Sequence, residues 1–468
     1  WELSQQIFGG IILGRSAVRD LTTGKPMRLI LGFMLPLLLG MLFQQFYNMV
    51  DTIVVGQYLG VNALAGVGST GSINFLVLGF VIGVCAGFAI PVAQKFGSKD
   101  YDALRKYVGN TFWLAVLFAA LLTVATCLLC SNILHWMKTP DKVFSEAYEY
   151  IFVIFLGIPV TFLYNILSGI IRSLGDSKTP VIFLIISSIL NIALDVFMIV
   201  VLKMGVSGAG WATVISQLVS GLLCLIYMAK RFEILRLKKD DLKPEWYYIG
   251  RLCAAGLPMG LQYSITAIGS ILLQTAVNSL GPSYMAAVTA GNKVSQLLCC
   301  PIDAMGSTMA TYGGQNVGAG KIERVKKGLL DCSLLGICWS VMALGIAALF
   351  GGNLAMLFVN KNDVQSAADI PQILSFARQF LVINASFYIP LAFVNIVRFL
   401  IQGMGFSQIA VYAGVFELAA RGLFGLWLVP VLGYNAVCFA NPTAWILADL
   451  FLFPTYFACY RKLKRRTG

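Results

Sequence analysis

The sequence predicts an all-α integral membrane protein with twelve transmembrane helices in two pseudo-symmetric six-helix lobes. Hydrophobic residues make up 58% of the 468 residues, charged residues make up 12%, and the mean hydropathy is +0.80. A soluble core of this size could not bury so much apolar surface, so the lipid bilayer must surround most of the chain. Two copies of one segment, residues 59–108 and 280–329, divide the chain into related halves.

Each helical crossing of the hydrocarbon core needs about 20 apolar residues. Twelve stretches meet this requirement, with ends that the pattern defines only to within several residues. They are residues 27–55, 63–93, 108–130, 148–174, 180–202, 208–228, 252–279, 285–314, 329–349, 373–401, 409–432 and 437–460. The longer stretches are expected to tilt or to extend beyond the hydrocarbon.

The duplication can be followed at individual positions. Leu59-Gly60 recurs as Leu280-Gly281, Gln94 as Gln315, Gly97 as Gly318 and Arg105-Lys106 as Lys326-Lys327, all at one offset of 221 residues. Pro36, Gly175 and Gly205 likewise correspond to Pro258, Gly405 and Gly433. An even number of spans separates the copies, so the two lobes run in the same direction. Duplicated membrane units are typical of secondary transporters, in which two bundles move about a site between them.

The net charge of +13 reports membrane topology rather than nucleic-acid binding. Basic residues gather in alternate loops, at Lys95/Lys99/Arg105/Lys106, Arg172/Lys178, Lys230/Arg231/Arg236/Lys238/Lys239/Lys243, Lys321/Arg324/Lys326/Lys327 and the tail Arg461/Lys462/Lys464/Arg465/Arg466. The intervening loops hold only Lys138, Lys142, Lys203 and Lys361. By the positive-inside rule, both termini lie in the cytoplasm of a multi-pass protein of a prokaryotic cell membrane. Anionic lipid of the inner leaflet is the expected partner of the basic loops.

The charged stretch 231–247 contains the one domain boundary that the sequence suggests. We therefore expect an N-terminal lead-in at 1–24, a first lobe at 25–230, a cytoplasmic linker at 231–247, a second lobe at 248–460 and a basic cytoplasmic tail at 461–468. The first lobe would hold spans one to six, and the second lobe would hold spans seven to twelve.

Cysteine and histidine usage argues against a redox or metal-dependent enzyme. All eleven cysteines fall within expected spans, where free thiols pack as small apolar groups. Cys127 and Cys130 form a C-x-x-C pair, but no second pair accompanies it. The only histidine, His135, is expected in an outer loop, which makes a zinc site or a catalytic triad implausible. No cofactor is expected.

Acidic residues within a membrane are functional candidates because an unpaired carboxylate is costly there. Five lie within the expected spans: Asp51, Asp195, Asp303, Glu417 and Asp449. Arg421 follows Glu417 by four residues, which predicts a structural ion pair on one helix face. Asp303 could pair with Lys293 or Arg398, and Asp449 is expected near the inner end of its helix.

Asp51 and Asp195 differ from the other three acids because they have no evident basic partner. Beyond the first turn of each span, the only basic residue within the spans of the first lobe is Arg172, which is expected at the cytoplasmic end of the fourth span. Asn191 precedes Asp195 by one helical turn, so the amide and the carboxylate project from one face. If the first and fifth spans pack together, two carboxylates and an amide oxygen meet without a fixed cation. Carboxylates that share a site bind a proton more readily than an isolated one, and an oxygen-only site equally suits sodium. Either ion would make this a coupling-ion site.

These residues belong to runs that resemble a known family. The run Tyr47-Asn48-Met49-Val50-Asp51-Thr52-Ile53-Val54-Val55-Gly56, the run Leu190-Asn191-Ile192-Ala193-Leu194-Asp195 and the run Gly205-Val206-Ser207-Gly208-Ala209-Gly210-Trp211-Ala212-Thr213 are similar to those of multidrug and toxic compound extrusion (MATE) transporters, in particular the DinF-like branch. The resemblance covers roughly residues 20 to 466. It implies a two-lobed antiporter that exports amphipathic, often cationic, compounds in exchange for sodium ions or protons.

In that branch the cation site uses positions matched here by Asp51, Asn191, Asp195 and Thr213, and a bent first helix is matched at Pro36. The NorM-like branch also carries acids on its seventh and tenth helices. The corresponding spans 252–279 and 373–401 contain none. A second-lobe site of that type is therefore not expected, although Asp303 on the eighth span is a candidate substitute.

We expect alternating access, in which a cation at this site changes the packing of the first helix and so the affinity for drug. Candidate drug contacts are Phe43, Phe46, Tyr47, Phe75 and Asp303. The alternative is a lipid-linked precursor flippase of the same broader superfamily, although such proteins usually need several basic residues in the cavity. A membrane enzyme fits less well because no nucleophile constellation, metal cluster or D-D-x-x-D motif is visible. An ion channel fits less well because of the lobed repeat with its unpaired acidic pair. The expected partners are amphipathic drugs or toxins and lipid, with no nucleic acid, and the chain is expected to be a monomer.

Overall fold

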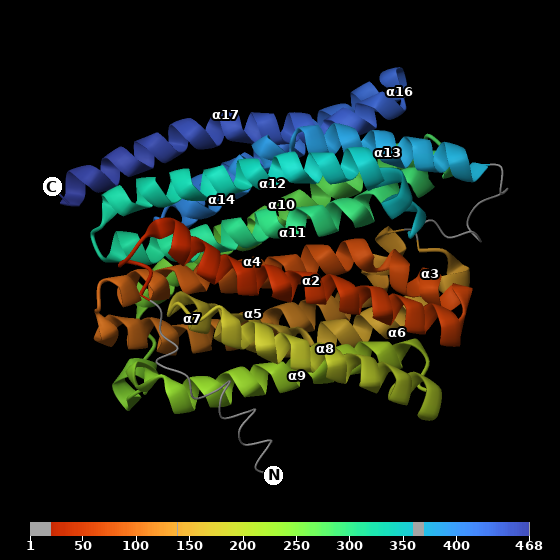
Figure 1. Cartoon of the computed structure of the whole chain (residues 1–468). Helices are drawn as coiled ribbons and strands as arrows, with labels where there is room; N and C mark the ends of the chain where they lie inside the picture. The colour runs from red at the N-terminus through yellow and green to blue at the C-terminus, as the bar shows by residue number, and fades with distance from the viewer. Residues whose placement is uncertain (1–19, 138, 359–368, 468) are drawn as a thin grey trace, which may run out of the picture.

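The computed structural model describes residues 20–137, 139–358 and 369–467, and all regular structure in these ranges is helical. Figure 1 shows two groups of roughly antiparallel helices, one from red to yellow-green and the other from green to blue. The first group is the first lobe and the second group is the second lobe. This arrangement confirms the all-α, two-lobed fold that the sequence predicts.

Within the residues that the structure describes, the first lobe holds eight α-helices and one π-helical turn. They are α2 (Pro26–Leu59), α3 (Val61–Ser69), α4 (Gly71–Gly97), α5 (Tyr101–Trp136), α6 (Asp141–Leu156), α7 (Ile158–Ser173), α8 (Lys178–Val196), the π-turn η1 (Phe197–Val201) and α9 (Val206–Arg231). Two short 3-10 turns, η2 (Glu233–Leu235) and η3 (Lys239–Leu242), follow α9 and lead into the second lobe.

The second lobe repeats this order. It consists of α10 (Trp246–Asn278), α11 (Pro282–Gly318), α12 (Ile322–Met356), α13 (Ile370–Ser386), α14 (Tyr388–Gly403), α15 (Ser407–Leu423), the π-turn η5 (Phe424–Leu428), α16 (Val429–Leu432) and α17 (Tyr434–Thr467). Each lobe therefore has one helical segment for each of its six expected spans.

Within the described ranges, nine helices are long and apolar enough to cross a membrane, and two bent pairs raise this number to eleven. The twelfth segment, α11, is 37 residues long but less apolar, and about half of its residues are buried against other helices. A helix that is covered by protein does not need an apolar surface toward lipid, which explains why hydropathy alone is weak there.

Three of the expected spans are broken, which the sequence pattern did not show. The span 63–93 divides at Thr70 into α3 and α4, because the Ser69 and Thr70 hydroxyls donate to the carbonyls of Gly66 and Val67 and compete with the helical ladder. The fourth span bends by 47° between α6 and α7 at Gly157. The tenth span bends by 51° between α13 and α14 at the equivalent place.

The backbone confirms the duplication more closely than the sequence does. The fifth and eleventh spans both end in a π-helical turn, η1 and η5. Gly205 follows the first turn with φ +63° and Gly433 follows the second with φ +61°, in the left-handed region that favours glycine. The repeat therefore preserves one unusual backbone path in both lobes.

The only histidine lies in a helix rather than in an outer loop. Helix α5 continues to Trp136, and the ring of His135 lies in its last turn, with Nδ1 2.7 Å from the carbonyl of Ser131. The same ring packs against Phe144 of α6. The sequence placed the end of this span too early, at residue 130, because polar residues begin there.

The two lobes meet backbone to backbone where α4 crosses α10. Added Cβ atoms on Gly83 and Gly87 would overlap the backbone around Met259 and Gly256, and Gly256 and Gly260 are equally crowded from α4. Glycines spaced four residues apart let membrane helices approach closely, and here both helices have such a pair. Nearer the outer end of this contact, the Ser264 hydroxyl donates to the carbonyl of Leu76 at 3.4 Å.

At the C-terminal ends of α4 and α11, which we call the inner end because the positive-inside rule predicts it there, the twin glutamines of the repeat hold the lobes together reciprocally. Gln94 of the first lobe donates to the carbonyl of Gly403 in the second at 2.9 Å, and Gln315 of the second donates to the carbonyl of Ser173 in the first at 2.8 Å. We call these two bonds the glutamine latch. A Cβ on Gly97 would overlap the Gln315 carbonyl, and one on Gly318 would overlap the Gln94 carbonyl.

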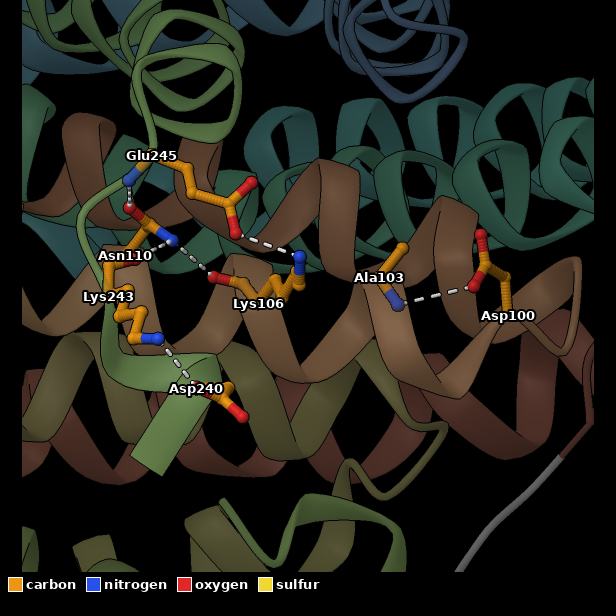
Figure 2. A network of polar contacts seen from close by, with 7 residues as sticks. All are labelled: Asp100, Ala103, Lys106, Asn110, Asp240, Lys243 and Glu245. Carbon is orange, nitrogen blue, oxygen red and sulfur yellow. Dashed lines mark hydrogen bonds and ion pairs between the residues drawn. The ribbon is translucent and has the colours of Figure 1, made fainter. Parts of the chain in front are cut away.

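The segment that joins the lobes is tied to α5 (Figure 2). Lys106 pairs with Glu245 at 2.8 Å, and the Asn110 side chain accepts from the Glu245 N–H at 2.9 Å and donates to the Lys243 carbonyl. Arg105 also pairs with Asp241 at 3.3 Å. At the start of α5, hydrogen bonds from Lys95 and from the Ala103 N–H lower the pKa of Asp100, which is the N-cap of the helix.

Loss of the glutamine latch should open the inner end of the lobe boundary. Each hydrogen bond contributes about 0.5–1.5 kcal/mol, so the double change Gln94→Ala/Gln315→Ala should raise the open fraction roughly tenfold or more. A cysteine introduced at Ala89, which lines the central cavity, would report this as faster reaction with an impermeant maleimide added on the latch side. The rate is compared with that of Ala89→Cys carrying both glutamines, and labelling of the parent chain is subtracted because its native Cys85 lines the same cavity.

The matched control is Gln379→Ala, which removes an exposed hydrogen bond to Asn435 within the second lobe. It should leave the labelling rate at the introduced cysteine unchanged. Equal labelling in the latch variant and the control would show that the two glutamines do not hold the inner end closed.

Candidate functional site

A cavity of about 550 Å³ occupies the interior of the first lobe and reaches the second. Its walls come from α2, α4, α6, α7, α8 and α9, with smaller contributions from α10, α11 and α14. Many of the lining side chains carry amides or hydroxyls, among them Gln44, Asn48, Asn74, Thr161, Asn165, Ser168, Ser187, Ser188, Asn191, Thr213, Ser216, Gln217 and Ser220. This lining is polar for a membrane interior and suits a solvated ligand or ion.

The structure brings Asp51 and Asp195 together at one end of this cavity. Asp51 lies on α2 and Asp195 on α8, and these two helices pack against each other. The carboxyl groups lie within hydrogen-bonding reach of one another, and Oδ1 of each has no hydrogen-bond partner. The Asp195 side chain is fully buried, whereas Asp51 lines the cavity. No ion pair involves either carboxylate within the described part of the chain.

Asn191 and Thr213 complete the group. The amide of Asn191, oriented so that both ends are satisfied, donates to Asp195 Oδ2 at 3.2 Å and accepts from the Thr213 N–H at 3.3 Å. Its other close neighbour is the Thr213 hydroxyl, 3.5 Å away. The four residues that the family resemblance suggested therefore form one cluster, in which an amide and a hydroxyl flank two carboxylates.

This cluster can bind a small cation. A hydrogen bond between two carboxyl groups requires a proton on one of them, so the contact between Asp51 and Asp195 suits a shared proton. The same oxygens, with the Thr213 hydroxyl, could instead surround a hard metal cation. Both states neutralise charge that no protein cation balances, which is the property required of a coupling site.

Pro36 lies on the same helix as Asp51, but α2 continues through it without a break. The fifteen-residue separation places the proline roughly 22 Å from Asp51 along the helix axis. Gly40, one turn after Pro36, packs directly against Val181 of α8. Movement of α2 near the proline would therefore be transmitted to the helix that carries Asp195.

The expected drug contacts divide into two groups. Tyr47 and Phe75 line the cavity, with Phe75 about half exposed at 47%. Phe43, Phe46 and Asp303 are not among its lining residues. Asp303 forms no ion pair within the described ranges, and the pairing with Arg398 that the sequence allowed is not present. Its neighbours along one face of α11, Ser307 and Thr311, do reach the cavity.

The second lobe buries its charges in a balanced cluster. Glu417 pairs with Arg421 at 3.3 Å, as the four-residue spacing predicts, and also with Arg398 of α14, which the sequence did not assign to it. Arg421 further donates to Asn441 at 3.1 Å. Asp449 lies close to Arg398 and Glu417 in the middle of α17, rather than near the inner end of its helix.

Two arginines therefore have roles that linear spacing could not reveal. Arg398 was visible as a cation inside a span, but its partner is 19 residues away on another helix. Arg172 was expected at the cytoplasmic end of the fourth span. The structure places its side chain on the cavity wall. Only the packing of the helices shows which way each side chain points.

The fold and the site define a membrane transporter, since a polar cavity between two membrane lobes contains an uncompensated pair of carboxylates. Comparison with known proteins agrees. The sequence profile of the MatE family matches residues 36–197 and 258–426. The chain belongs to this family, the MATE transporters.

Relatives cover much or most of the chain. A probable multidrug resistance protein of Bacillus subtilis, YoeA, is 31% identical over 63% of this chain and 65% of its own length. A second one, YpnP, is 28% identical over 81% of this chain and 82% of its own. A protein described as an FAD transporter from Shewanella oneidensis is 24% identical over 79% and 80%, respectively.

Solved structures confirm the fold. An outward-facing multidrug resistance MATE family transporter superposes with a TM-score of 0.86 at 22% identity, covering 95% of this chain and 98% of that one. A MATE crystal structure in a bent conformation gives a TM-score of 0.86 at 21% identity, covering 96% and 98%. At these identities the likeness concerns architecture, so the roles of individual residues must come from the site itself.

The buried cluster of the second lobe should be essential for stability. Glu417→Gln would remove the carboxylate that forms ion pairs with Arg398 and Arg421, and breaking a buried ion pair costs about 3–5 kcal/mol. We expect a marked fall in the melting temperature of the detergent-solubilised protein. The exposed pair of Glu233 and Arg236 provides the control, because Glu233→Gln should cost about 1 kcal/mol or less. Similar melting temperatures for the two variants would contradict this assignment.

Proposed function

We propose that the protein is a cation-coupled antiporter that exports amphipathic, often cationic, organic compounds by alternating access. The observation that carries the proposal is the contact between Asp51 and Asp195 beside a polar cavity, with no protein cation to neutralise it. Family membership supports export of drug-like compounds, since two of the relatives are named as probable multidrug resistance proteins. No cofactor enters the proposal, because the driving force is the gradient of the coupling ion.

In this proposal, cation transport and drug transport are coupled because the cation and the drug compete for the same part of the cavity. A cation that binds Asp51 and Asp195, with Asn191 and Thr213 as neutral ligands, removes the negative charge that attracts a cationic drug. A drug bound in the same cavity opposes cation binding in turn, and this reciprocity is the thermodynamic requirement of an antiporter. Movement of α2 around Pro36 is the proposed means by which cation binding changes the shape of the cavity.

The coupling ion is proposed to be sodium or a proton. The direct contact between carboxyl groups favours a proton, whereas Asn191 and Thr213 add neutral oxygens that a proton does not need. Among the residues that the structure describes, no three His, Cys, Asp or Glu side chains gather as a metal site. A sodium ion would therefore depend on the amide and hydroxyl oxygens for part of its coordination.

The charge distribution supports an orientation with both termini in the cytoplasm. The tail residue Lys464 pairs with Glu323 at the start of α12, and Lys321 and Arg324 hydrogen-bond to the backbone of Thr22 and Gly24. Both described ends of the chain thus lie on the face that carries the basic loops and the glutamine latch. We propose that this face meets the cytoplasm and its anionic lipid, and that the protein acts as a monomer.

A lipid-linked precursor flippase is the alternative. The cavity does contain one basic side chain, Arg172, but a pyrophosphate would be expected to require several. The carboxylate pair at the other end has no evident role in binding such a polyanion. The antiporter therefore accounts for more of the site.

The decisive test is export from proteoliposomes under imposed sodium or proton gradients, applied separately. Asp195→Asn should abolish gradient-driven export because the coupling cation loses its most buried ligand, and Asp51→Asn should do the same. Whichever gradient drives the unmodified protein identifies the ion. A cationic dye of the rhodamine class serves as the transported probe.

Asp303→Asn is the matched control, since it removes a carboxylate of the second lobe that lies outside the pair. It should retain gradient-driven export. Undiminished coupling in Asp195→Asn, with loss in Asp303→Asn, would move the coupling site to the second lobe and overturn the proposal.

A further inference from the structure

Arg172 is a cation without a counter-charge on the wall of the central cavity. It lies in the last turn of α7 and is only partly buried. Among the described residues, no hydrogen bond or ion pair reaches its guanidinium. A charged side chain facing a cavity inside a membrane protein is costly unless something binds it, which makes it a candidate for ligand recognition.

The acid nearest in sequence is already occupied. Asp176, one turn after Arg172, accepts from the Tyr227 hydroxyl at 2.8 Å, from the Thr179 hydroxyl at 2.7 Å and from the Lys178 N–H at 3.1 Å. The other buried arginines of the chain behave differently, since Arg398 and Arg421 both pair with Glu417. Arg172 is thus the exception among the interior arginines.

Arg172 lies at the opposite end of the cavity from the carboxylate pair. On α7 the lining residues run from Thr161 to Arg172, roughly 16 Å along the helix axis. Helix α2 runs in the opposite sense, and its lining residues extend from Leu37 to Asp51 over roughly 21 Å. Asp51 and Arg172 therefore mark an acidic end and a basic end, separated by amides, hydroxyls and aromatic rings such as Tyr164.

The residue of the second lobe that corresponds to Arg172 has only a packing role. In the repeat, Ser173 corresponds to Gly403, because each supplies the carbonyl for one bond of the glutamine latch. Gln402 is then the counterpart of Arg172. It is fully buried, and its amide donates to Gln262 of α10. Where the second lobe has a neutral side chain with a partner, the first lobe has a charged one without.

We propose that Arg172 binds an anionic group of the exported compound, a carboxylate, sulfonate or phosphate. The inference rests on the proposed function and narrows its substrate class to amphipathic molecules that carry a negative charge at one end. A zwitterion fits best, since its cationic part would lie toward Asp51 while its anion meets the guanidinium. The planar guanidinium can bind a carboxylate through two parallel hydrogen bonds, which a point charge cannot do.

The test compares two ligands that differ by one charge. The probes are a fluorescent rhodamine with a free carboxylate and the methyl ester of the same dye, and binding to purified protein is measured by fluorescence polarisation. The unmodified protein should prefer the free acid by about ten- to a hundredfold, the range expected for a charged hydrogen bond in a protein interior. Arg172→Gln should remove this preference without weakening the affinity for the ester, which is a cation that the guanidinium would repel.

Arg172→Lys should retain part of the preference, because it keeps the charge but loses the paired geometry. Lys178→Gln is the control for general electrostatic attraction. It removes an exposed cation close in sequence that does not line the cavity, and it should preserve the full preference. Retained or tighter binding of the ester also shows that Arg172→Gln is folded, so a misfolded variant cannot imitate the expected result.

Three results would overturn the proposal: equal affinities for acid and ester in the unmodified protein, a preference that survives Arg172→Gln, or a preference that added phosphatidylglycerol eliminates. The last would assign the arginine to a lipid phosphate instead of a transported compound. Because binding is measured without a gradient, a failure of cation coupling at Asp195 would leave this test intact, and the two failures can be distinguished.

Discussion

The close contact between α4 and α10 is the constraint on which the rest of the structure depends. Four glycines bring the two helices close together, because Gly83 and Gly87 lie against the backbone of α10 and Gly256 and Gly260 lie beneath side chains of α4, which leaves little room for rearrangement at the crossing. Each lobe must therefore move largely as a unit about this contact. The glutamine latch lies toward the C-terminal end of the same helix α4, away from the glycine crossing, and its two hydrogen bonds are individually modest.

The two lobes have the same backbone fold, but their charged residues are distributed differently. The second lobe pairs its buried glutamate with two arginines, and another acid within its spans, Asp303, has no ion pair among the described residues but does not line the cavity. The first lobe leaves two carboxylates in contact and one arginine unpaired, all in or beside the cavity. Among the described residues, the charged side chains that line the cavity, Asp51 and Arg172, both belong to the first lobe.

Much of this architecture was accessible from the sequence because it depends on local spacing and composition. Hydropathy located the spans, the constant offset revealed the duplication, and the four-residue intervals placed Asn191 beside Asp195 and Glu417 beside Arg421. What could not be predicted depends on three-dimensional packing. The break at Thr70 needs hydroxyl groups to compete with backbone donors, and the pairing of Arg398 with Glu417 joins different helices. The orientation of Arg172 into the cavity likewise depends on how α7 is rotated against α4 and α9.

The correspondence between Arg172 and Gln402 has a consequence for how such a protein can arise. Two identical half-length chains, assembled side by side about an axis through the membrane, would place the same residue at both positions. An arginine would then lack a partner in both halves, or a glutamine would be satisfied in both. Fusing the halves into one chain allows one half to keep an unpaired arginine while the other half has a glutamine with a partner. The linker that Lys106 and Asn110 hold against α5 is therefore what joins two lobes of the same fold whose interior residues differ.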